Sequence, residues 1–224
     1  MYNYQTVKII QTLIYSVPAT LIAIVLHEVA HAGVSYLCGD KMVKAEGRLS
    51  LNPLKHLDLM GTLCLILFHM GWAKPVRVNT RAYKHRKLDF CLVALAGPVM
   101  NFFIAFIAMI LMFLVGNYGG KGTITNYLFY LFYYIAVLDV GLGVFNLIPI
   151  PPLDGSNVLL LFLPDSIERK LARVRQYLPL ILAILLISGI LNVPLSWLNS
   201  RIINGMWSFV IHMFGYTTAG AGMI

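Results

Sequence analysis

The first long apolar segment of the chain decides the class of fold. Residues 9–37 read IIQTLIYSVPATLIAIVLHEVAHAGVSYL and contain no Lys or Arg and a single carboxylate, at Glu28. A transmembrane helix needs about 20 predominantly apolar residues. Because backbone exposed to lipid must satisfy its own hydrogen bonds, we expect this segment to form a membrane-spanning helix.

The composition of the whole chain agrees with that expectation. Its 224 residues are 59% hydrophobic and only 12% charged, whereas an ordinary soluble domain has about 25% charged residues. This excludes a soluble globular protein and, at this length, predicts a single membrane-embedded domain over residues 1–224. The three cysteines share no C-x-x-C spacing, so neither a disulfide framework nor a cysteine zinc site is indicated.

Three further apolar stretches are long enough, or nearly so, to span a membrane as helices: residues 90–115, 127–148 and 177–198. Residues 61–72 are apolar too, but a 12-residue helix is only about 18 Å long. We expect them to form a segment that is re-entrant or packed inside the protein, and residues 202–214 to form a short helix that is interfacial or partly inserted in the membrane.

Short strands near the membrane surface are the last element that the pattern suggests. Polar and apolar residues alternate over residues 43–51 and 76–79, which is typical of strands. The predicted fold class is therefore an all-α multipass membrane protein with about four transmembrane helices, a re-entrant segment and short membrane-associated strands.

The basic residues predict the orientation of the chain. Ten of the 17 Lys and Arg residues lie within residues 39–89 and four more within residues 165–176. Short loops rich in Lys and Arg stay in the cytoplasm, so we expect these two loops inside and residues 116–126 outside. The net charge of +8 then records orientation in a cell membrane, and we expect no nucleic-acid partner.

Two histidines in the first span have the spacing of a metal site. His27, Glu28 and His31 form the pattern H-E-x-x-H, which places both imidazoles on one helix face and Glu28 where it can activate a water molecule. The alternatives are a polar helix end or chance. Three such side chains in an apolar span cost several kcal/mol unless they are paired or bind a metal, which favours the functional interpretation.

A catalytic zinc site needs a third protein ligand. The carboxylates within apolar stretches are Glu28, Asp139 and Asp154. Asp154 follows three prolines within residues 149–152, which prevent regular helix. Broken backbone at membrane depth is tolerated where it lines a cavity, so a site is indicated there, although a simple kink is the alternative.

Taken together, these motifs resemble the site-2 protease family of intramembrane zinc metalloproteases. The resemblance rests on HEVAH at residues 27–31 and FNLIPIPPLDG at residues 145–155. It extends through three further motifs, RLSLNPLKHLDLMGT at 48–62, GWAKPV at 71–76 and AGPVMN at 96–101. These core motifs cover roughly residues 20–165 and leave 166–224 for C-terminal helices. The chain looks like the compact prokaryotic branch that lacks PDZ and CBS domains.

The resemblance implies roles for individual residues. His27, His31 and Asp154 match the ligands of Zn²⁺, and Glu28 matches the general base and later proton donor. Asn101 and Asn146 match positions that support the active site or bind the substrate backbone, with helix capping as the alternative. Asp139 departs from the family, whose members more often have an amide there.

The loop residues Asn52, His56 and Asp58 are more ambiguous. We expect them to fix the loop in which they lie, and an additional metal site is the alternative. The roles of Asp139, His56 and Asp58 are left open at this point.

The resemblance implies an intramembrane zinc endopeptidase that cuts within or next to transmembrane segments of other membrane proteins. The expected partners are such a substrate, the lipid bilayer and a regulatory membrane protein that the sequence does not identify. Hydrolysis needs water, so we expect a polar cavity that opens toward the cytoplasmic side. The alternatives are a divalent-metal-binding membrane transporter and an inactive scaffold of protease ancestry.

Overall fold

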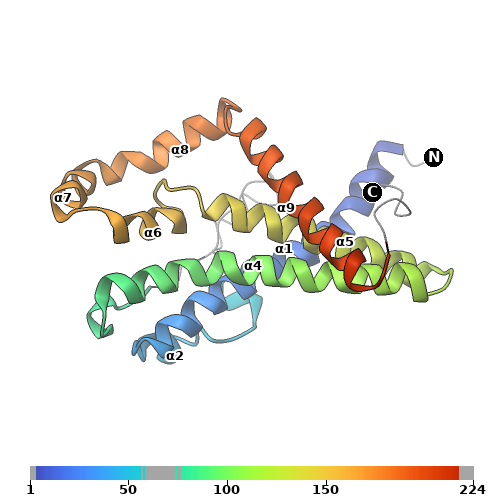
Figure 1. Ribbon diagram of the computed structural model, residues 1–224, viewed down its shortest axis with the longest axis horizontal. Coiled ribbons are helices and arrows are strands. Elements are labelled where there is room, and N and C mark those ends of the chain that lie inside the picture. The colour runs from blue at the N-terminus through green and yellow to red at the C-terminus, as the bar shows by residue number, and fades with distance from the viewer. Residues whose placement is uncertain (1–3, 57, 59–73, 75–76, 217–224) are drawn as a thin grey trace. The chain divides into compact units, whose positions relative to one another are not determined.

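The computed structural model describes residues 4–56, 58, 74 and 77–216, and every regular element among them is a helix (Figure 1). In chain order these elements are α1 (Tyr4–Leu37), α2 (Met42–Ala45), η1 (Pro53–Lys55), η2 (Thr80–Ala82), α4 (Arg86–Tyr118), α5 (Thr123–Asn146), α6 (Asp154–Phe162), α7 (Asp165–Val174), η3 (Arg175–Tyr177), α8 (Leu178–Ile187) and α9 (Asn192–Met213). The prediction of an all-α fold is confirmed.

Among the described residues, three helical segments are long and apolar enough to cross a membrane. They are Ile9–Leu37 of α1, Arg86–Tyr118 and Thr123–Asn146. These correspond to the first three predicted spans. In the part of the chain that the structure describes, a fourth span is obtained if the helices on either side of a break, Arg175–Ile187 and Asn192–Met213, are counted together.

The predicted single helix over residues 177–198 is wrong, and so is the separate short helix over 202–214. Helix α8 ends at Ile187, Gly189 has a φ of 72°, and α9 continues without interruption from Asn192 to Met213. Glycine adopts this left-handed conformation readily and commonly ends a helix. Pro194 then lies in the first turn of α9, where its missing N–H has no helical partner to lose.

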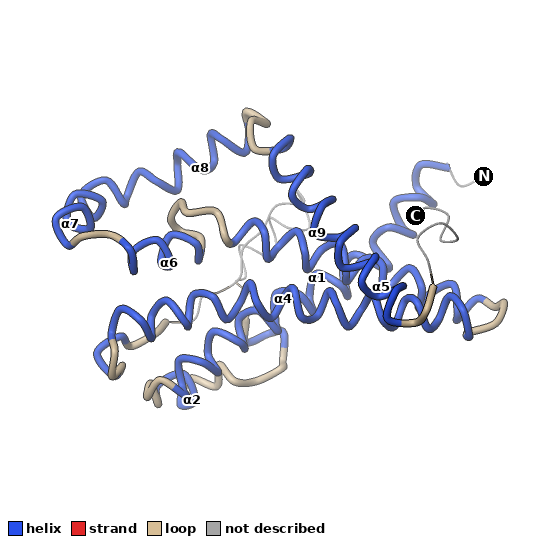
Figure 2. Tube along the Cα trace, viewed as in Figure 1, coloured by secondary structure: helices blue, strands red, loops and turns tan. Residues whose placement is uncertain are grey.

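The strand prediction is also wrong where the structure describes it. Residues 42–45 form α2, residues 46–49 form turns, and residues 77–79 have no regular secondary structure (Figure 2). The buried Arg48 side chain donates hydrogen bonds to the carbonyls of Lys55 and Lys74. This side chain, rather than a strand ladder, therefore holds the loop. Residue 76 and the predicted re-entrant segment at 61–72 lie outside the described residues.

The chain folds as two compact parts. The first part comprises the described residues among 1–23, 101–142 and 193–224, and the second those among 24–100 and 143–192. Helices α1, α4 and α5 each contribute to both parts. All the residues that form the cavities discussed below belong to the second part.

The first part is a helical bundle with an apolar core. The buried residues of this core cluster come from α1, α4, α5 and α9, and they are Ala19, Ala108, Met109, Phe113, Ile135, Ala136, Val210 and Ile211. Alanine allows the backbones of membrane helices to approach closely, which matters because burial from water does not drive helix association in lipid. Phe113 stacks on Phe214 with a distance of 4.5 Å between ring centroids.

In the second part, the loop residues singled out from the sequence bind nearby backbone. The Asn52 carboxamide oxygen accepts a hydrogen bond from the Leu54 N–H at 3.0 Å and caps η1. His56 is fully buried, and its Nε2 lies 2.6 Å from the Ser50 carbonyl oxygen, to which it donates. These contacts confirm that Asn52 and His56 fix the loop.

Candidate metal centre

Helix α1 places the two histidines of the motif on one face. The Nε2 atoms of His27 and His31 are 3.0 Å apart, and the two rings meet edge to face. Both residues are buried, with exposed fractions of 5% and 8%. Two imidazoles so close together, with their ring nitrogens facing each other, supply two of the three protein ligands that a catalytic zinc site needs.

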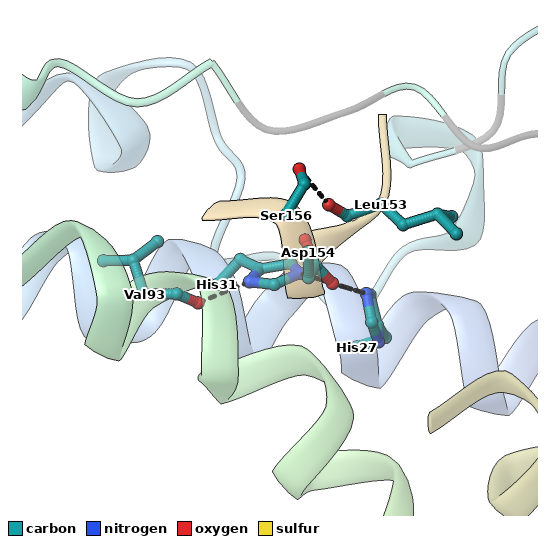
Figure 3. A network of polar contacts seen from close by, with 6 residues as sticks. All are labelled: His27, His31, Val93, Leu153, Asp154 and Ser156. Atoms are coloured by element: carbon teal, nitrogen blue, oxygen red, sulfur yellow. Dashed lines mark hydrogen bonds and ion pairs between the residues drawn. The ribbon is translucent and has the colours of Figure 1, made fainter. Parts of the chain in front are cut away.

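Asp154 completes the group from the start of α6. Its Oδ2 atom lies 3.2 Å from Nε2 of His27 and 3.2 Å from Nε2 of His31. Figure 3 shows the carboxylate, carried by α6, facing the imidazoles carried by α1. The structure therefore brings together two elements separated by more than 100 residues, and it selects Asp154 from the acids considered in the sequence.

The proline-rich break before α6 makes this approach possible. Helix α5 ends at Asn146, and α6 begins at Asp154 itself. The Ser156 hydroxyl donates to the Leu153 carbonyl at 2.7 Å and closes the turn. A Cβ atom on Gly155 would collide with the backbone of Leu147. Glycine is therefore required next to Asp154 to let the start of α6 lie against the end of α5.

The three atoms have the spacing that a zinc ion requires. Zinc binds imidazole nitrogen and carboxylate oxygen at about 2.0–2.2 Å in tetrahedral geometry, which separates neighbouring ligand atoms by about 3.3 Å. The separations of 3.0, 3.2 and 3.2 Å match one face of such a tetrahedron. Within the described residues this is the one group of three potential ligands that lie close enough to share an ion.

A backbone carbonyl fixes the orientation of His31. Its Nδ1 lies 2.6 Å from the carbonyl oxygen of Val93 in α4. Because a carbonyl only accepts, Nδ1 must donate, which leaves the lone pair of Nε2 available for a metal in the neutral imidazole. Val93 was not identified from the sequence, since a backbone acceptor has no residue signature.

The charge state of Asp154 suits a metal ligand. Burial raises the pKa of its carboxyl, but the Nε2–H groups and positive charge that His27 and His31 carry when protonated outweigh burial and lower the pKa to about 2. The side chain is therefore a carboxylate at neutral pH. An anionic oxygen and two neutral imidazoles form a donor set that is common in catalytic zinc sites.

Gly97 in α4 makes room for the two imidazoles. A Cβ atom at this position would lie 2.5 Å from His27 Cε1 and 2.5 Å from His31 Nε2. No side chain fits without moving both histidines. The requirement explains the glycine of the AGPVMN motif, whose role the sequence alone did not reveal.

Gly97→Ala is expected to lower zinc affinity by about 10- to 100-fold, the range for changes that displace ligands without removing them. The fold should persist, because alanine is a better helix former than glycine by about 1 kcal/mol. Competition of the purified chain with a chromogenic chelator measures the affinity. The matched control is Gly33→Ala on α1, where an added Cβ atom would meet no described atom within 4 Å. Unchanged affinity in Gly97→Ala would contradict the packing described above.

A cavity of about 230 Å³ opens beside the three ligand atoms. Glu28 and Asn146 line it together with His27, His31 and Asp154. Its other lining residues are Val78, Phe90, Val93, Ala94, Pro152 and Asn157. We call it the catalytic cavity. Asn101 is fully buried but belongs to the first part of the chain, so its role at the site stays a prediction.

A buried carboxylate holds one wall of the catalytic cavity in place. Asp40, 1% exposed, accepts hydrogen bonds from the N–H of Asn79 at 2.7 Å and from the N–H of Met42 at 3.0 Å. Ser35 donates to the same carboxylate and also contacts Tyr83. Asp40 thereby anchors the segment that carries Val78 to the end of α1.

Comparison with known proteins agrees with the geometry. The profile described as Peptidase family M50 matches residues 117–189, which include Asp154. The chain is 36% identical over 165 residues to the Bacillus subtilis protein named "Putative zinc metalloprotease YwhC", an alignment that covers 73% of this chain and 75% of that protein.

Two mycobacterial proteins, both named "Putative zinc metalloprotease Rip2", are also similar. The Mycolicibacterium smegmatis protein is 32% identical over 178 residues, or 77% of this chain and 66% of that protein. The Mycobacterium tuberculosis protein is 26% identical over 208 residues, or 91% and 76% of the two chains. No solved structure gives a significant match.

Proposed function

This chain belongs to peptidase family M50, the site-2 protease family of zinc metalloproteases, and from that premise we propose that it cuts peptide bonds within or next to transmembrane segments of other membrane proteins. One observation carries the proposal. His27, Glu28 and His31 lie on a helix long and apolar enough to cross a membrane, and Asp154 meets the two histidines there. A hydrolytic site in such a helix can reach bonds that lie inside the bilayer.

His27, His31 and Asp154 would hold the zinc ion through Nε2, Nε2 and a carboxylate oxygen. When bound, zinc acts as a Lewis acid that lowers the pKa of a water molecule and polarises the scissile carbonyl. Three protein ligands leave a fourth position open, as catalytic zinc sites require. The catalytic cavity provides space beside that position.

Glu28 handles the proton. Its half-buried carboxylate lines the catalytic cavity one residue after His27. The carboxylate accepts a proton from the attacking water and then donates it to the leaving amine, which completes hydrolysis with Glu28 returned to its starting state. Asn146, which lines the same cavity, supports the substrate backbone through its amide.

A helical substrate must unwind locally before attack, because its carbonyls are hydrogen-bonded within the helix. The extended peptide then enters the catalytic cavity, where Val78 contributes to a wall from a segment, residues 77–79, without helical structure. This wall offers backbone groups to an extended chain in the manner of edge pairing. The anchoring of Asn79 by Asp40 keeps it in position.

The alternative of a metal transporter receives less support. A transport pathway needs successive binding sites, whereas the described residues contain the single ligand group of His27, His31 and Asp154. The relatives are also named as zinc metalloproteases. A glutamate between the two histidines serves water activation and has no function in transit.

From the basic loops we infer that the catalytic cavity faces the cytoplasm. In a background with the native cysteines replaced by alanine, cysteines at Lys84 and Arg173 should react with a membrane-impermeant maleimide only from the cytoplasmic side. A cysteine at Lys121 should react only from outside. All three positions are exposed, so a lack of labelling would not arise from burial. Labelling of positions 84 and 121 from the same face would contradict this orientation.

Zinc removal tests the function directly. The chain is reconstituted in liposomes with a mixture of extracted membrane proteins, and new peptide termini are identified by mass spectrometry. Termini within or beside apolar segments should appear with zinc, disappear with a chelator such as phenanthroline and return when zinc is restored. New termini confined to soluble loops would contradict intramembrane cleavage, and the absence of any zinc-dependent termini would contradict proteolysis.

A further inference from the structure

A second cavity adjoins the catalytic cavity in the second part of the chain. It has a volume of about 470 Å³, and we call it the basic cavity. Its walls include Arg86, Lys87, Phe90, Asn157, Glu168 and Arg175. These come from the start of α4, from α6, from α7 and from η3. The volume is sufficient for one or two amino-acid side chains.

The basic cavity shares two lining residues with the catalytic cavity. Phe90 and Asn157 line both. Asn157 lies three residues after Asp154 on α6, so the two side chains share one face of that helix. A peptide that passes the ligand group can therefore follow this face of α6 from one cavity into the other.

Asn157 also offers an acceptor along that route. Its Oδ1 atom is buried and has no hydrogen-bond partner among the described residues. A buried acceptor without a donor costs about 1–3 kcal/mol. A backbone N–H of a bound peptide would remove that cost, and no described residue forms a hydrogen bond with this atom.

Charge determines what the basic cavity attracts. Arg86, Lys87 and Arg175 contribute three cations, and Glu168 is the one acid among its lining residues in the described part of the chain. Glu168 contacts Lys87 at 3.5 Å, with both side chains about half exposed. Such an exposed ion pair contributes at most about 1 kcal/mol, so another carboxylate can replace Glu168.

The spacing along α6 sets the position of that carboxylate. Leu160, which also lines the basic cavity, is six residues after Asp154, or about 9 Å along the helix at 1.5 Å per residue. An extended peptide covers a similar distance, about 10 Å, in three residues. The side chain that reaches the basic cavity therefore belongs to a residue about three positions from the scissile bond.

We propose that the basic cavity is a substrate subsite that binds an Asp or Glu side chain about three residues from the cleaved bond. The subsite rests on the proposed protease function and adds a preference for acidic substrate segments. Arg86 and Arg175 form ion pairs with the substrate carboxylate, which also replaces Glu168 as the partner of Lys87. Asn157 accepts a hydrogen bond from the peptide backbone. An anionic lipid headgroup is disfavoured, because a phosphate has no N–H to satisfy Asn157 and has no reason to lie next to the catalytic cavity.

Binding of paired peptides tests the subsite without cleavage. The probe is a dye-labelled peptide with a 20-residue Leu/Ala segment and one Glu in a Gly/Ser-rich flank, and its twin carries Gln in place of Glu. Both are titrated by fluorescence anisotropy against zinc-loaded Glu28→Gln chain in neutral detergent. The Glu peptide should bind about tenfold more tightly, as expected for one carboxylate between two arginines.

Three changes in the same background separate the subsite from a general charge effect. Arg86→Gln with Arg175→Gln should remove the difference between the twin peptides, whereas Arg173→Ala, an exposed cation on α7 outside the cavity lining, should leave it intact. Glu168→Gln should raise affinity for the Glu peptide about two- to threefold, because the competing carboxylate is gone. This last change retains all the cations and tests the subsite even if the double variant fails to fold.

Two outcomes would overturn the subsite. One is equal affinity for the twin peptides, or a difference that survives the double arginine change in a folded chain. The other is retention of phosphatidylglycerol in native mass spectrometry that depends on Arg86 and Arg175 while the peptides bind equally, which would assign the cavity to lipid. Neither outcome involves proteolysis, so failure of the subsite is distinguishable from failure of the protease function.

Discussion

Glu28→Gln is expected to retain about one zinc ion per chain and to lower proteolysis by about 10²- to 10⁴-fold, the usual contribution of a positioned general base. Glutamine has nearly the same size and keeps the cavity lining, but its amide does not accept a proton at neutral pH. Glu28 lies outside the group of three ligand atoms, so the metal should remain. Metal content by mass spectrometry and the zinc-dependent termini described above measure the two effects.

The matched control is Glu46→Gln, which removes a carboxylate from the loop that contains Arg48 and leaves the catalytic cavity unchanged. It should retain both zinc and proteolysis. Retained proteolysis in a Glu28→Gln preparation of confirmed sequence would remove the basis for the enzyme assignment. Loss of zinc from the same preparation would instead make Glu28 a ligand.

Local spacing made the metal centre predictable from the sequence. His27 and His31 are four residues apart, a spacing that predicts one shared helix face. The structure confirms the shared face, with the two Nε2 atoms 3.0 Å apart. The proline-rich segment before Asp154 predicted a break, and α5 does end at Asn146. The pairing of Asp154 with the histidines is a long-range contact, which the family resemblance indicated and the residues alone left open.

The residues that support the site were harder to predict. Gly97 and the Val93 carbonyl act through close approach between α1 and α4, and such an approach depends on how two helices pack rather than on either sequence. Asn157 was not identified from the sequence either, because its place beside both cavities depends on how the helices pack. Its only visible signal was its position three residues after Asp154 on the same helix.

The errors in secondary structure have identifiable causes. Alternation over residues 43–51 favoured a strand, but the Arg48 side chain satisfies backbone carbonyls in a turn-rich loop. Hydrophobicity favoured one helix over 177–198, but Gly189 and Pro194 divide it. In both places the specific contacts or backbone geometry of one or two residues outweigh the average character of the segment.

The second prediction with a large effect concerns the choice between Asp154 and Asp139 as the third zinc ligand. Asp154→Asn is expected to lower zinc affinity more than about 100-fold, beyond the range for residues that only support ligands, and to lose activity in parallel. An amide oxygen carries no net charge and is a poor zinc ligand. Because Asp154 Oδ2 lies 3.2 Å from both histidine nitrogens, its replacement removes one of three ligands.

Asp139→Asn should leave zinc bound, with at most a partial loss of rate. Asp139 is fully buried in α5, belongs to the first part of the chain and has no hydrogen-bond partner for either carboxylate oxygen among the described residues. Asparagine has nearly the same shape as aspartate, so the substitution keeps the packing. It removes a carboxylate that receives no hydrogen bond from the described residues. Metal analysis of the two purified variants decides between the acids. Zinc lost from Asp139→Asn and kept by Asp154→Asn would mean that the ligand geometry around His27 and His31 has been assigned to the wrong carboxylate.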